Sequence, residues 1–264
     1  MIESSAVVDF QIVEETDDYA VVDKPPFLLI HPTKPDGRRT LLHELRELFA
    51  FEIAAGGQIS IINRLDRETS GLVLIAKKPA VARRFGLLMQ RRHLQKEYLA
   101  VVYGWPEWET TFVDGPLDRQ GKHRNSAIWL KQMIHQSGAP ARTDFRVERR
   151  FMRSLGAVGP KPSHLDERTA LDRQKFSLIR AVPLTGRTHQ IRVHLASIGH
   201  PIVGDKIYGP DESLYLRFIE NGWTSQLQRQ LLLPRHALHS TRLAIEGEHD
   251  WTCSLPPDLA DFIS

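Results

Sequence analysis

Two apolar runs separated by a polar loop constrain the fold of this chain most. Ile59, Ile61 and Ile62 precede the loop, and Leu72–Ala76 follows it directly. Runs of this length that are rich in β-branched residues and interrupted by Thr-Ser-Gly are typical of two strands joined by a tight loop. We therefore predict a strand, a loop and a second strand over residues 59–76.

The loop between the two runs carries a notable aspartate. Residues 63–71 read Asn-Arg-Leu-Asp-Arg-Glu-Thr-Ser-Gly and place Asp66 between Arg64 and Arg67. Nearby positive charges favour the ionised carboxylate, and an ionised, positioned aspartate can act as a nucleophile. The commoner role of such an aspartate is an exposed ion pair. From the residues alone, both roles stay open.

Length and composition narrow the class of protein. The 264 residues are enough for one large or two small domains, and 41% apolar with 25% charged residues is typical of a soluble globular chain. No apolar stretch approaches the roughly 20 residues of a membrane span, and the N-terminus lacks the features of a signal peptide. Cys253 is the only cysteine, which excludes an intrachain disulfide and a thiolate metal cluster. We expect a cytoplasmic protein.

A block of positive charge follows the second apolar run. Residues 77–96 contain seven Lys or Arg and no Asp or Glu. Pro79 is suited to a helix start, and one face of the following helix is apolar through Val81, Phe85, Leu88 and Met89. A solvated helix face normally mixes both signs, whereas a single-sign block suits a phosphate backbone. We predict a basic helix over 79–92 that contacts an anionic polymer through Arg83, Arg84, Arg91 and Arg92.

The rest of the chain alternates short strands and helices. Residues 10–30 predict two short strands, and Thr40 can cap a helix that carries leucines at helical spacing. Further strands are predicted over 96–103, 143–149 and 176–183, a variable insertion over about 151–174, and a helix within 184–195 that ends before Gly199. We therefore predict a single α+β domain over 1–264, with an extended, mixed but mostly antiparallel central sheet flanked by helices and loops.

Three ordered motifs, within about residues 21–243, resemble those of the RluA-type pseudouridine synthases. The first is Arg-Leu-Asp-x-x-Thr-Ser-Gly at 64–71, which departs from the usual pattern at Asn63, where the family usually has histidine. The second is Lys-x-Tyr at 96–98, and the third is Thr-Gly-Arg-Thr-His-Gln-Ile-Arg at 185–192. Because the strand pattern starts by residue 10, we expect the catalytic domain without the extra N-terminal RNA-binding domain of many relatives.

The resemblance implies a pseudouridine-synthase fold and a set of site residues. It implies that Asp66 is catalytic, as a nucleophile or as the group that starts base elimination, and that Arg192 pairs with it. Tyr98 is the candidate to stack on the target base, although a strand tyrosine packed in the core is the commoner arrangement. Further substrate contacts are expected from Arg64, Arg67, Arg187, His189 and Ile191.

The implied reaction is an isomerisation of uridine in RNA, so we expect no cofactor. The substrate is expected to be a stem-loop of ribosomal or transfer RNA, and the protein a monomer. We expect no metal, because His189 and His194 are five residues apart, whereas zinc-binding helices place histidines four apart. Two alternatives stay open: an RNA-binding protein of this fold without catalysis, and a carboxylate glycosidase that would need a second acid such as Glu68.

Overall fold

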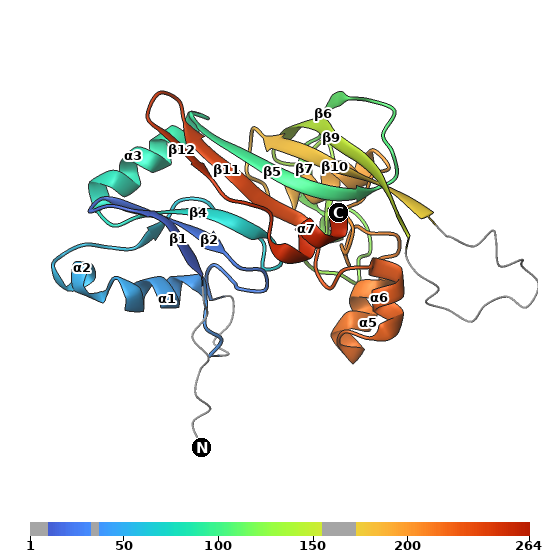
Figure 1. Ribbon diagram of the computed structural model, residues 1–264, viewed down its shortest axis with the longest axis horizontal. Coiled ribbons are helices and arrows are strands. Elements are labelled where there is room, and N and C mark those ends of the chain that lie inside the picture. The colour runs from blue at the N-terminus through green and yellow to red at the C-terminus, as the bar shows by residue number, and fades with distance from the viewer. Residues whose placement is uncertain (1–9, 33–36, 155–172) are drawn as a thin grey trace, which may run out of the picture. The chain divides into compact units, whose positions relative to one another are not determined.

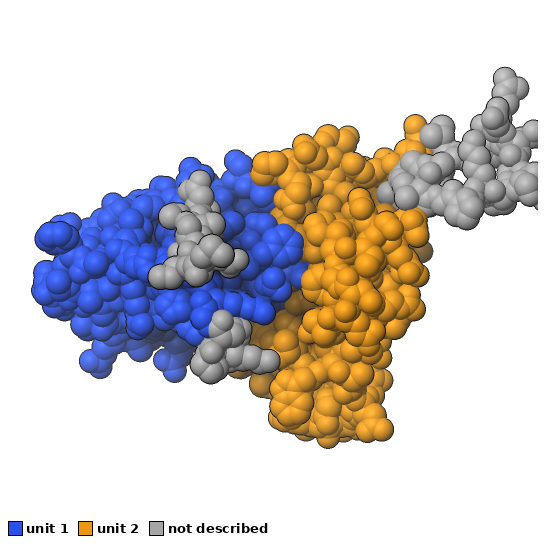
Figure 2. Space-filling model, turned by 90° about the horizontal axis from the view of Figure 1, so that it is seen from below, with its two compact units in different colours: residues 1–97, 239–256 blue, residues 98–238, 257–264 orange. Residues whose placement is uncertain are grey.

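The computed structural model describes residues 10–32, 37–154 and 173–264, and it divides into two compact units (Figures 1 and 2). Unit 1 takes in residues 1–97 and 239–256, and unit 2 takes in residues 98–238 and 257–264. The single catalytic domain over residues 1–264 stays a prediction.

Unit 1 is built around β4, a strand that pairs on both of its sides. β4 is antiparallel to β2 and to the short β3, and it is parallel to β11, while β1 extends β2 and β12 extends β11. The elements of this unit are β1 (Gln11–Glu15), β2 (Tyr19–Lys24), α1 (Leu41–Leu48), α2 (Ala50–Ala54), β3 (Ser60–Ile61), β4 (Ser70–Ala76), α3 (Pro79–Gln90), β11 (Leu238–Ile245, from His239 on) and β12 (His249–Thr252).

All seven residues of β4 are buried, so both faces of the unit 1 strands are covered. On one face, Phe85 of α3 packs into an apolar cluster with Tyr19, Leu72 and Trp251. Figure 1 shows α1 and α2 on the other side of these strands from α3. Helix α1 begins after Thr40, and α3 begins at its proline, which confirms both predicted helix starts.

Unit 2 is built around β10, which is antiparallel to both β5 and β9, and β9 pairs in turn with β6. A separate ribbon of β7 and β8 shares an apolar cluster with Val193 of α4. The elements of this unit are β5 (Leu94–Tyr103, from Tyr98 on), β6 (Thr110–Asp114), β7 (Leu117–Arg119), the 3-10 turn η1 (Gln120–Lys122), β8 (Gln132–Ile134), β9 (Arg142–Ser154), β10 (Arg173–Pro183), α4 (Gln190–Ser197), α5 (Ser213–Asn221), α6 (Ser225–Leu231) and α7 (Pro257–Ile263).

The predicted α+β class with mostly antiparallel strands is confirmed, and two boundaries are corrected. The ends of the predicted insertion are strand, because Ser154 of β9 pairs with Arg173 of β10; residues 155–172 lie outside the described residues. The basic helix ends at Gln90 rather than at residue 92, since Arg92 adopts a left-handed conformation with φ of 62°. Among the described helices, none has the length and apolar character that a membrane crossing requires.

Candidate active site

Asp66 lies half-buried in the loop that connects β3 to β4. Its carbonyl oxygen accepts a hydrogen bond from the Thr69 N–H at 3.1 Å. The buried Asn63 amide fixes the start of the loop, because its Nδ2 donates to the Leu72 carbonyl (3.0 Å) and its Oδ1 accepts from the Leu74 N–H (2.8 Å). The loop therefore begins on a side chain that completes the hydrogen bonding of β4.

The end of the same loop is fixed by close backbone packing. Ser70 and Gly71 pair in parallel with His239 and Ser240 of β11. Gly71 has a φ of +110°, and a Cβ added there would lie 2.3 Å from the Ser240 carbonyl oxygen. Only glycine permits both this conformation and this approach, which explains why the loop ends in Thr-Ser-Gly.

Lys24 ties a second segment to the loop. Its side chain is fully buried, and its Nζ donates to the carbonyls of Pro25 (2.7 Å), Leu28 (3.0 Å) and Arg67 (3.3 Å). The exposed Arg67 side chain donates from Nε to the Phe27 carbonyl at 3.3 Å. Sequence analysis did not single out Lys24, because a lone lysine after a strand gives no signal of burial.

Arg64, on the other side of Asp66, is exposed and acts electrostatically on a histidine. Partial burial, followed by the charges of Arg64 and Arg46, lowers the pKa of His31. These effects favour the neutral form of His31.

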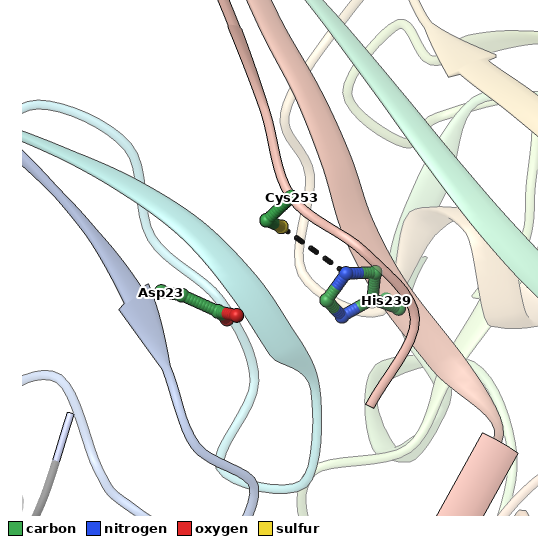
Figure 3. Close-up of side chains that lie close together, drawn as sticks. All are labelled: Asp23, His239 and Cys253. Atoms are coloured by element: carbon green, nitrogen blue, oxygen red, sulfur yellow. Dashed lines mark hydrogen bonds between the residues drawn. The ribbon is translucent and has the colours of Figure 1, made fainter. Parts of the chain in front are cut away.

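A polar cluster lies behind the loop in unit 1 (Figure 3). His239 Nε2 lies 3.2 Å from Cys253 Sγ, and His239 Nδ1 lies 3.0 Å from the Ser70 hydroxyl. Asp23, His239 and Cys253 form a group whose ligand atoms lie within 4.8 Å of one another and could hold a metal ion. Burial raises the pKa of Asp23, and burial together with the Asp23 charge raises that of Cys253 to about 12. A metal would therefore have to displace the thiol proton.

The basic helix is partly neutralised by acids from other elements. Arg83, Arg91 and Arg92 are exposed. Three other members of the basic block form salt bridges: Lys77 with Glu15 (2.6 Å) and Glu52 (3.2 Å), Lys78 with Asp18 (2.8 Å), and Arg84 with Glu248. Part of the positive charge of residues 77–96 is therefore neutralised by carboxylates from other elements of unit 1.

In unit 2, Tyr98 lies on β5 opposite Ala181 of β10 and is 7% exposed. The other tyrosine of this strand, Tyr103, is half-buried, and its hydroxyl donates to the Leu231 carbonyl at 3.3 Å. Burial raises the pKa of Tyr103. Tyr98 is thus the more buried of the two, and its stacking role stays a prediction.

The third motif folds around Gln190, a residue to which sequence analysis gave no role. The buried Gln190 Oε1 accepts from the Thr185 hydroxyl (2.7 Å) and the Arg187 N–H (3.0 Å). Its Nε2 donates to the Arg142 carbonyl (2.9 Å) and the Thr143 hydroxyl (3.0 Å). One amide therefore shapes the turn before α4 and holds it against β9, while the Arg187 side chain stays exposed.

His189 precedes α4 in a left-handed conformation, with φ of 57°. Its Nδ1 lies 2.8 Å from the Tyr208 hydroxyl, which accepts from the Gln132 N–H of β8 at the same distance. A cavity of about 370 Å³ lies beside these groups, lined in part by Tyr208, Gln132 and Ala196 of α4. Ile191, in the first turn of the helix, is buried.

Arg192 forms a buried ion pair with Asp205, a partner that sequence analysis did not assign. Arg192 Nε lies 2.7 Å from Oδ2, and Nη2 lies 2.9 Å from Oδ1, with exposures of 5% and 0% for the two residues. Oδ1 also accepts from the N–H groups of Ile207 and Tyr208. Burial disfavours the Asp205 charge, but the Arg192 guanidinium outweighs it and holds the pKa of the carboxyl well below its usual range. Asp66 and Arg192 belong to different units, and their pairing stays a prediction.

Comparison with known proteins decides the family. A family model described as RNA pseudouridylate synthase matches residues 18–197. The chain belongs to this family. Ribosomal large subunit pseudouridine synthase D of Nitrosomonas europaea is 32% identical over 261 residues, which cover 96% of this chain and 64% of the relative. The protein of the same name from Escherichia coli K12 is 33% identical over 267 residues, which cover 97% of this chain and 70% of that relative. The chain thus spans about two thirds of the length of these pseudouridine synthases.

Solved structures share the fold of this chain. Human RNA Pseudouridylate Synthase Domain Containing 1 matches with a TM-score of 0.66 at 25% identity, covering 98% of this chain and 89% of that one. Human RNA Pseudouridylate Synthase Domain Containing 4 matches with a TM-score of 0.67 at 22% identity, and the match covers 94% of this chain and 90% of that one. The predicted pseudouridine-synthase fold is confirmed.

Proposed function

We propose that this protein is an RNA pseudouridine synthase that isomerises uridines in structured RNA. The observation that carries the proposal is Asp66 in a loop fixed at both ends, in a chain of the pseudouridylate synthase family. The relatives described above are named for the large ribosomal subunit, so ribosomal RNA is the first substrate to test and transfer RNA the second.

The reaction breaks the bond from ribose carbon 1′ to the uracil nitrogen, turns the base, and joins carbon 1′ to carbon 5, which loses its proton. Asp66 acts as the nucleophile or starts the elimination of the base. The released uracil nitrogen takes up one proton and carbon 5 gives up one to solvent, so the atoms and electrons balance without a redox partner or cofactor. The base must first leave the stack, at a cost of a few kcal/mol, and Arg64 fills the space that it vacates.

The other site residues support this step. Tyr98 stacks on the uracil, and buried Ile191 helps to exclude water. Arg192 orients the Asp66 carboxylate; a guanidinium carries five N–H donors, so its pair with Asp205 is compatible with a second carboxylate.

Binding of the RNA backbone falls to basic side chains. Arg67, Arg187 and His189 contact the nucleotides near the target. Exposed arginines of α3 and of the turn that follows it hold phosphates: Arg83, Arg84, Arg91 and Arg92. Such contacts make affinity depend strongly on salt. We propose that one copy of the chain is sufficient for the reaction.

Release of tritium from RNA labelled at carbon 5 of uridine tests the proposal directly. Unmodified ribosomal and transfer RNA transcripts are incubated with the wild type, with Asp66→Asn and with Glu68→Gln as the matched control from the same loop. We expect release by the wild type and the control, and none by Asp66→Asn. Release by Asp66→Asn at the wild-type rate would refute the role of Asp66. Binding of RNA in a gel shift without any release would instead favour an RNA-binding protein without catalysis.

A further inference from the structure

The ribbon of β7 and β8 and its connecting turn carry a second concentration of positive charge, in unit 2. Residues 117–137 contain four Lys or Arg and a single acid, Asp118. The Asp118 carboxylate lies 2.8 Å from Lys122 Nζ and 2.9 Å from His123 Nε2, and it also accepts from the Arg119 N–H. The one acid is therefore satisfied within the segment.

Arg119 and Trp129 form a stacked pair on this segment. The Arg119 guanidinium carbon lies 3.6 Å from the centroid of the Trp129 ring, and Trp129 is 72% exposed. A single exposed apolar residue needs no explanation, but this ring is covered on one face by a cation and open to solvent elsewhere. Arg119 Nε is buried without a hydrogen-bond partner. A buried donor left unsatisfied is costly, so the position of Arg119 under the ring calls for a function.

The cations beside this pair are suited to an anionic ligand. Among the described residues, Arg119 and Arg124 form no salt bridge with a carboxylate. Arg124 is exposed and donates to the Gln120 side chain at 2.9 Å, at the edge of the 370 Å³ cavity. A flat aromatic ring flanked by such cations has the two features that recognition of unpaired nucleotides requires: a stacking face and phosphate contacts.

We propose that Trp129, backed by Arg119, is a stacking platform for an unpaired base of the RNA substrate, with Arg124 on a neighbouring phosphate. This inference rests on the proposed function, and it adds a second nucleotide-binding position to the one that holds the target uridine. The ribbon is tied to the third motif, because the Gln132 N–H donates to the Tyr208 hydroxyl, which contacts His189. On this proposal the substrate presents an unpaired base close to the nucleotides that the third motif contacts, as a loop or a bulge does and a continuous duplex does not.

Affinity for two probes tests the platform. The probes are a fluorescein-labelled RNA stem-loop and a fully paired duplex of the same stem. We expect Trp129→Leu to weaken stem-loop binding about 5- to 100-fold, the range that loss of one stacked base gives, and to leave duplex binding unchanged. Trp129→Phe keeps a ring and should stay within about threefold of the wild type. Trp105→Leu is the matched control, since Trp105 is an exposed tryptophan of the same unit that also carries a cation, Lys175, over its ring.

Circular dichroism and thermal melting establish that each variant is folded before binding is compared. Equal stem-loop affinity for the wild type and Trp129→Leu, or equal losses in Trp129→Leu and Trp129→Phe, would overturn the platform. Tritium release separates its failure from that of the proposed activity. The platform predicts a raised KM and an unchanged kcat for Trp129→Leu. Release by the wild type with no effect of Trp129→Leu on KM refutes the platform alone, whereas Trp129-dependent binding without any release refutes the activity alone.

Discussion

The buried pair of Arg192 and Asp205 has consequences for stability that can be worked out from its geometry. Replacing Arg192 by methionine leaves the Asp205 carboxylate fully buried without its guanidinium partner, although it still accepts from the N–H groups of Ile207 and Tyr208. Breaking a buried ion pair by removing one partner costs about 3–5 kcal/mol of unfolding free energy. For a chain of this size, that corresponds to a fall in Tm of roughly 5–15 °C.

A double-mutant cycle measures the pair itself. Asp205→Asn alone leaves the Arg192 charge buried without its carboxylate partner. Arg192→Met with Asp205→Asn removes both charges, so the double variant should lose about 2–3 kcal/mol less unfolding free energy than the sum of the two single losses. Urea unfolding at neutral pH, followed by circular dichroism, gives the four free energies. Additive single changes, or an Arg192→Met variant within about 1 kcal/mol of the wild type, would refute the reasoning.

The same cycle separates the two roles of Arg192. If the double variant is stable but releases no tritium, Arg192 acts in the chemistry, in accordance with its predicted pairing with Asp66. If stability and release both return, its role is structural.

The pH dependence of stability provides a further check on the pair. The pKa of Asp205 is lower in the folded protein than in the unfolded chain. Its contribution to stability is therefore present above the unfolded pKa and is lost as the pH falls toward the folded value. Asp205→Asn should therefore flatten the loss of stability below about pH 4.

Three further experiments test other parts of unit 1. Gly71→Ala should lower the free energy of unfolding by more than about 2 kcal/mol, because the left-handed φ of residue 71 is strained for alanine and the added Cβ meets backbone atoms. Gly86→Ala is the control: residue 86 is exposed on a helix with nothing within 4 Å of an added Cβ, so this change should raise the free energy of unfolding by about 0.5–1 kcal/mol in the same urea titration. Cys253, with its pKa raised to about 12, should react with iodoacetamide at pH 8 at least about tenfold more slowly in the folded protein than in urea; equal rates would contradict its burial. Arg83→Gln should reduce the slope of log K for RNA against log salt by about 1, and Arg84→Gln by less, since a carboxylate already opposes its charge; equal effects would show that this salt bridge does not matter.

Local patterns predicted the elements of the fold well. The strand, loop and strand over residues 59–76, and the helix starts at Thr40 and Pro79, follow from apolar periodicity, β-branched residues and residues suited to helix ends, all of which act within a few residues along the chain. The length of β9 and β10 could not be predicted in this way. The residues near Ser154 and Arg173 are polar, and they are strand because each pairs with the other.

Partners distant in the sequence were the harder part of the site. Residues 77–96 contain no acid, yet Lys77 is buried between Glu15 and Glu52, which come from β1 and α2. Nothing in the sequence around Asp205 indicates that Arg192 would reach it. Which charges remain available to RNA is therefore decided by the tertiary fold, and the sequence predicts only where charges are concentrated.

The departure from the usual family pattern at Asn63 can now be interpreted physically. Its side chain both donates to the Leu72 carbonyl and accepts from the Leu74 N–H, so it satisfies two backbone groups of β4 that its own strand does not reach. A neutral histidine also offers one donor and one acceptor, so the usual residue could make an equivalent pair of contacts. The residue beside Arg64 is thus a support for the loop. Because Gly71 fixes the other end against β11, Asp66 is held from both sides by groups that need not touch the substrate. Such support is what positions a reacting group, and it explains how substitution at residue 63 is compatible with retention of the aspartate.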